Sequence, residues 1–101
     1  MANKEQTLVI APDQVLTVDT DRAVWREIGD EVVILDVPTT TYLNLNKSAR
    51  VLWKRLDGGA TSLELAAELV ATYGISESQA ASDVRGFLDA LQERSLLSFP
   101  R

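Results

Sequence analysis

The chain contains no cysteine and no histidine. Without cysteine there is no disulfide, no thiolate nucleophile and no thiolate metal ligand. Without histidine the commonest general base and metal ligand is missing, so the serines and threonines have no imidazole partner to activate them. Aspartate pairs such as Asp19 with Asp21 remain, but acidic residues in proteins are mostly surface charge. We therefore expect no enzymatic activity, no bound metal and no cofactor.

Long apolar runs and an excess of positive charge are also missing. No segment approaches the roughly 20 apolar residues that a membrane helix needs, and the N-terminus has no signal-peptide core. Ten basic residues stand against fifteen acidic ones, for a formal net charge of −5. Nucleic-acid-binding proteins are usually basic, because phosphate neutralisation supplies much of their affinity. We expect a cytoplasmic protein that binds neither a membrane nor nucleic acid.

What is present fits one globular domain over residues 1–101, with the polar residues 1–7 as a flexible tail. Three segments rich in β-branched and aromatic residues predict an antiparallel meander: Ala23–Ile28, Glu31–Val37 and Thr39–Leu45. The middle segment is the most apolar and is expected at the centre of the sheet. Short extended pieces at Leu8–Ile10 and Gln14–Val18 flank Pro12 and can be edge strands at most.

Three helices follow the strands. Asn46 is placed to cap the first helix, which should end near Asp57 with a left-handed cap at Gly58-Gly59. Capping boxes at Thr61–Glu64 and Ser76–Gln79 predict the starts of the second and third helices. An apolar tail from Leu96 to Phe99 is expected to dock on the core. Strands before helices predict an α+β fold that is winged helix-turn-helix-like, with an N-terminal three-stranded antiparallel sheet followed by three helices.

The third strand carries no charge from Thr39 to Asn46. Exposed edge strands normally carry charges or prolines that block pairing with other chains. The strand is therefore either central or covered, or its edge accepts an extended peptide by β-strand addition. In the second case the third helix would form the far wall of a groove, with Asp83, Phe87 and Arg94 on one flank. Its polar positions are mostly acidic, which leaves a winged-helix DNA-binding regulator as a weaker alternative.

Several segments between about Ala23 and Phe99 form a familiar pattern: Tyr42–Asn46, Val51–Trp53, Tyr73–Ile75, Asp83–Leu91 and Leu96-Leu97. Together they resemble the PqqD-like family, the recognition elements of ribosomally made and post-translationally modified peptides (RiPPs). The family often has glycine before the final Leu-Leu, where this chain has Ser95. The resemblance implies a non-catalytic protein of three strands and three helices that binds a precursor's leader peptide as an added strand.

Within the family, Asp36, Tyr42 and Leu45-Asn46 look most like a stand-alone lasso-peptide B1 protein. This likeness implies three partners: the precursor leader peptide, a leader peptidase (B2-type) and a lactam cyclase (C-type). The alternative is a PqqD-type peptide chaperone for a radical SAM enzyme in PQQ or other RiPP biosynthesis. By position, the leader would lie antiparallel to the third strand and contact Thr39, Thr40, Thr41, Tyr42, Leu43, Asp83, Val84 and Phe87. A Thr41→Pro substitution is then expected to remove an edge N–H and abolish binding.

Overall fold

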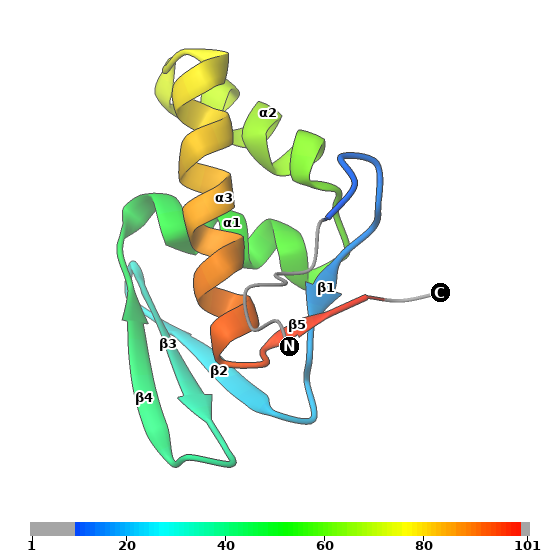
Figure 1. Ribbon diagram of the computed structural model, residues 1–101. Helices are drawn as coiled ribbons and strands as arrows, with labels where there is room; N and C mark the ends of the chain where they lie inside the picture. Colours follow the sequence, from blue (N-terminus) through cyan, green and yellow to red (C-terminus); the bar gives the residue numbers. More distant parts are fainter. Residues whose placement is uncertain (1–9, 100–101) are drawn as a thin grey trace.

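The computed structural model describes residues 10–99, and Figure 1 shows their arrangement. The elements in chain order are β1 (Thr17–Val18), β2 (Ala23–Ile28), β3 (Glu31–Asp36), β4 (Thr41–Leu45), α1 (Lys47–Asp57), α2 (Ser62–Tyr73), α3 (Glu77–Glu93) and β5 (Leu97–Ser98). The predicted α+β fold, with an antiparallel meander before three helices, is confirmed. The expected tail at residues 1–7 and the start of the first extended piece lie outside the described residues.

Strands β2, β3 and β4 form one antiparallel sheet with β3 in the centre, as the apolar pattern of β3 predicts. Val32 and Ile34 of β3 are fully buried on the face that packs against the helices. On the same face, the Trp25 ring of β2 meets the buried Trp53 of α1 edge-on, with ring centroids 6.1 Å apart and planes at 83°. This aromatic pair fixes α1 against the sheet.

The helix starts follow the capping residues. Asn46 Oδ1 accepts a 2.9 Å hydrogen bond from the Ala49 amide at the start of α1. The Ser76 hydroxyl caps α3 through the Gln79 amide, but the Gln79 side chain donates to Asp83 instead of completing the predicted box. The end of α1 also follows the expectation: the helix ends at Asp57, and the Gly58-Gly59 pair supplies its left-handed residue at Gly59, with φ 91°, while Gly58 has φ −88°.

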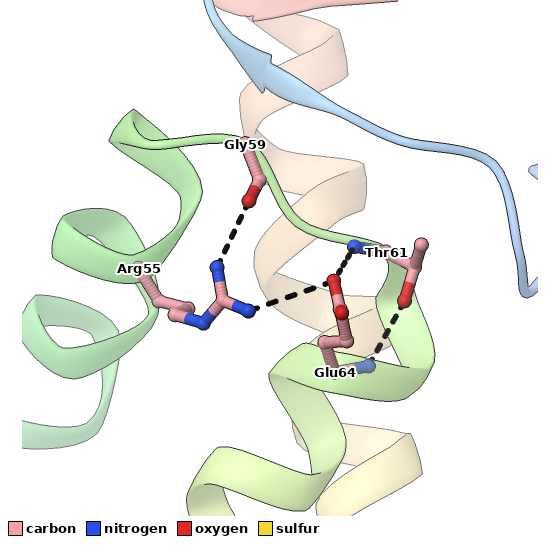
Figure 2. A network of polar contacts seen from close by, with 4 residues as sticks. All are labelled: Arg55, Gly59, Thr61 and Glu64. Carbon is pink, nitrogen blue, oxygen red and sulfur yellow. Dashed lines mark hydrogen bonds and ion pairs between the residues drawn. The ribbon is translucent and has the colours of Figure 1, made fainter.

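Figure 2 shows the polar contacts that join α1 to α2. The predicted Thr61–Glu64 capping box is complete, with Glu64 N to Thr61 Oγ1 at 3.1 Å and Thr61 N to Glu64 Oε1 at 2.9 Å. Arg55 of α1 donates to the Gly59 carbonyl at 2.9 Å and lies 3.6 Å from the Glu64 carboxylate. One arginine therefore holds the loop and the start of α2 in place.

The two ends of the described chain form a second, two-stranded sheet that the sequence pattern did not predict. Strand β1 pairs antiparallel with β5, so Thr17 lies opposite Ser98 and Val18 opposite Leu97. The apolar tail after α3 docks as expected, with Leu96 fully buried and Leu97 8% exposed. In Figure 1 this small sheet lies away from β4, which forms the opposite margin of the molecule. None of the helices within residues 10–99 is long and apolar enough to cross a membrane.

Candidate functional site

Strand β4 lies at one edge of the three-stranded sheet. It pairs with β3 on one side, from Thr41 opposite Asp36 to Leu45 opposite Val32, and within residues 10–99 no strand pairs with its other side. Figure 1 shows β4 as the outermost strand of the sheet. Among the described residues, the uncharged strand is therefore neither central nor paired on both sides.

The register tells which backbone groups of β4 face this edge. The Val37 amide donates to the Arg22 carbonyl at 2.8 Å, on the β2 side of β3. In an antiparallel strand the N–H and C=O groups of one residue both point to the same edge, and those of the next residue point to the opposite edge. The polar groups of Asp36 therefore point toward β4, and those of its partner Thr41 point back toward β3.

The same alternation directs the N–H and C=O groups of Tyr42 and Asn44 outward, while those of Leu43 point inward to β3. An added strand would exchange hydrogen bonds with Tyr42 and Asn44. This corrects the expectation for Thr41→Pro, because the Thr41 N–H belongs to the internal β3–β4 ladder. Proline at Asn44 is the substitution that removes an edge N–H.

A groove of about 520 Å³ lies between the inner face of β4 and α3. Its strand side includes Leu43 and Leu45, and its helix side includes Phe87 and Leu91. The remaining lining residues are Ile34, Asn44, Asn46, Ser48, Ala49, Leu52, Ser82, Asp83, Gly86, Ala90 and Arg94. An apolar floor beside a row of free backbone groups suits a peptide, whose main chain pairs with the edge while alternate side chains enter the groove.

The structure brings only some of the predicted site residues into this groove. Leu43, Asp83 and Phe87 line it. Val84 is 2% exposed and lies among residues lining a different hollow, on the opposite side of α3. Tyr42 is 67% exposed, and strand alternation places its side chain on the outer face of the sheet.

The predicted start of the third strand was wrong by two residues, because Thr39 and Thr40 lie in the β3–β4 turn rather than on the strand. Thr40 has φ 54°, and its amide donates to the Val37 carbonyl at 3.2 Å. Thr39 and Thr41 join their hydroxyl groups at 2.9 Å across the turn. These threonines close the hairpin at the end of the edge.

Gly86 and Ala90 are lining residues that the sequence reasoning did not single out. Both could have been found from helical spacing, since positions three and seven residues after Asp83 share its flank. Asn46 and Ser48 also line the groove. They enter it because the start of α1 follows β4 directly.

Comparisons with known proteins give a family match and solved structures with a similar fold. The family model of coenzyme PQQ synthesis protein D (PqqD) matches residues 31–97. The structure of TbiB1 in complex with the TbiA(beta) leader peptide is 30% identical, with a TM-score of 0.76 over 84% of this chain and 98% of that chain. A lasso peptide synthetase B1 complexed with the leader peptide shares the fold at 20% identity, with a TM-score of 0.73 over 82% and 96% of the two chains. Among curated proteins, none matches the sequence.

Proposed function

This chain belongs to the PqqD family, and we propose that it is a non-catalytic protein that binds the leader of a ribosomally made precursor peptide by β-strand addition. The observation that carries this proposal is the uncharged edge of β4, unpaired within residues 10–99 and lying beside an apolar groove. The 30% identical TbiB1 was solved with a leader peptide, and the match covers 98% of that chain. The proposed contacts are the edge groups of Tyr42 and Asn44, with Leu43, Asp83 and Phe87 in the groove.

The pathway we propose is lasso-peptide biosynthesis. The protein would hand its bound precursor to a leader peptidase and a lactam cyclase in the cytoplasm. The likeness to TbiB1 in complex with a leader peptide supports the leader as its ligand. Presentation of the leader as a strand would leave the rest of the precursor outside the groove, available to an enzyme. The second candidate is a chaperone for a radical SAM enzyme, which the PQQ-synthesis description of the matching family model favours.

The test is fluorescence anisotropy of a labelled leader peptide, taken from a small precursor gene beside this one and titrated with the protein. We expect saturable binding at micromolar concentration or below. An Asn44→Pro variant should lose at least about tenfold in affinity, because it removes an edge N–H while the β3–β4 ladder stays intact. Asn44→Ala, which keeps the N–H and removes only the side chain beyond Cβ, should bind clearly more tightly than Asn44→Pro.

Circular dichroism on both variants checks that the sheet survives. Equal binding by folded Asn44→Pro and Asn44→Ala would rule out pairing at this edge. Failure of every neighbouring leader to bind, together with binding of duplex DNA, would instead favour the winged-helix regulator.

A further inference from the structure

The groove beside β4 has opposite charges on its helix wall, separated by an apolar stretch. Asp83 and Arg94 both line it. They are three turns apart on one flank of α3, because 11 residues at about 100° each return to nearly the same direction. Phe87, Ala90 and Leu91 lie between them on the helix. The helix wall therefore has a negative end, an apolar middle and a positive end.

Neither charge is matched by an ion pair within residues 10–99, where the two ion pairs both involve α1 side chains. Asp83 accepts a 2.8 Å hydrogen bond from the Gln79 amide group, which orients its carboxylate without neutralising it. Lys47 lines a neighbouring hollow that also reaches Asp83, but the two side chains form no ion pair. Both groove charges therefore remain available to a ligand.

The order of the two charged residues along the groove can be related to the direction of β4. Strand β4 and helix α3 run in opposite senses in Figure 1, so the start of α3 lies toward the end of β4. Asp83 accordingly shares a second hollow with Asn46 and Ser48, at the start of α1. Arg94 lies at the other end of α3, as its C-cap residue. The negative end of the groove is thus the end where β4 passes into α1.

We propose that this groove selects its peptide by the order of charges along the peptide, an inference that rests on the proposed function. A cationic side chain of the leader lies at Asp83, an apolar side chain lies against Phe87 and Leu91, and an anionic side chain lies at Arg94. Every strand pair of the sheet is antiparallel, and antiparallel pairing is slightly more stable per residue than parallel pairing. In an antiparallel added strand the cationic residue precedes the anionic one.

The spacing of the two charges follows from helix and strand geometry. Eleven helical residues span about 16 Å, a distance that an extended chain covers in about five residues. Side chains that enter the groove must be an even number of positions apart, because strand neighbours point to opposite faces. The leader that fits has Lys or Arg four or six residues before Asp or Glu, with an apolar groove-facing residue between them.

Three versions of one labelled leader test this polarity. The groove-facing residues on either side of its apolar anchor are made Lys then Glu, Glu then Lys, or Gln and Gln. We expect the Lys–Glu version to bind about two- to fivefold more tightly than the uncharged version. The Glu–Lys version should bind at least about tenfold more weakly than the Lys–Glu version. A D83K/R94E variant should reverse this order.

The matched control is R85E/D89K, which exchanges the same types of charge on α3. Arg85 and Asp89 line the hollow on the opposite side of the helix, so this variant should keep the original order. Equal binding of all three versions to the unchanged protein would overturn the polarity but leave leader binding intact. Preference for the Glu–Lys version would also overturn it. Failure of all three to bind would overturn both this inference and the proposed function.

Discussion

Two residues on α3 or just after it are unfavourable residue types for their backbone conformations. Gly86 lies in the interior of α3, where a glycine costs about 0.5–1 kcal/mol relative to alanine. A Cβ built at Gly86 would meet no atom within 4 Å, so packing does not require the glycine. Ser95 has φ 60°, a left-handed conformation that costs a non-glycine residue about 1 kcal/mol. The glycine that the family often carries at this position would remove that strain.

Substitutions at Gly86 and Ser95 test the stability of the protein and its binding of the leader separately. Gly86→Ala and Ser95→Gly should each raise the free energy of unfolding by about 0.5–1 kcal/mol in urea titrations. Only Gly86→Ala should weaken leader binding, because Gly86 lines the groove and its open space accepts the ligand. Ser95→Gly is the matched control, equally stabilised but outside the groove. Unchanged leader affinity in Gly86→Ala would show that the peptide does not approach α3 at this point.

At the scale of elements, the segment from Leu16 to Asp19, which contains the two-residue strand β1, is held from both sides. The Leu16 amide and carbonyl exchange hydrogen bonds with Ala60, at 2.8 and 2.9 Å, in the loop before α2. On the other side Val18 pairs with Leu97 of β5, and the Asp19 amide donates to the Leu96 carbonyl at 2.8 Å. The segment before the meander thus joins the end of the described chain to the helical layer.

We expect Leu16→Ala to lower the free energy of unfolding by about 2–5 kcal/mol, since Leu16 is fully buried and its truncation leaves a cavity. Val15→Ala is the neighbouring control, because Val15 is 48% exposed and should change stability by less than about 1 kcal/mol. Urea unfolding followed by tryptophan fluorescence measures both. Similar losses in the two variants would mean that this segment contributes little to the core.

The sequence could predict the elements whose local signals are strong. Capping residues located the helix starts, and the apolar pattern located the central strand. Sheet β1–β5 could not be predicted. Each of its strands has only two residues, too few to show an alternation of apolar and polar side chains, and their pairing joins distant parts of the chain. The turn at Thr39 and Thr40 was mistaken for strand because β-branched residues favour strands, whereas the left-handed Thr40 depends on closure of the hairpin. In the groove, helical spacing identified Asp83, Phe87 and Arg94, whereas the family resemblance added Val84, which faces the core.

At the scale of the whole molecule, the excess of negative charge and the apolar groove predict how binding responds to salt. Main-chain hydrogen bonds and apolar anchors are little affected by ionic strength, and two exposed ion pairs contribute weakly. The leader affinity measured by anisotropy should therefore change by less than about tenfold between about 50 and 200 mM salt. A protein that contacts phosphates loses about 10³–10⁵ over the same range. A loss of that size would favour a polyanionic ligand over a leader peptide.

The free edge of β4 also governs how the purified protein behaves in the absence of its ligand. An edge without charge or proline offers the same template to a second molecule of the protein as to a leader. Concentrated samples therefore contain a competitor for the groove, namely the β4 edge of every other copy. We expect the unliganded protein to associate at high concentration and the leader peptide to act as a solubilising additive, so that light scattering finds stocks prepared with the leader monodisperse at the same protein concentration.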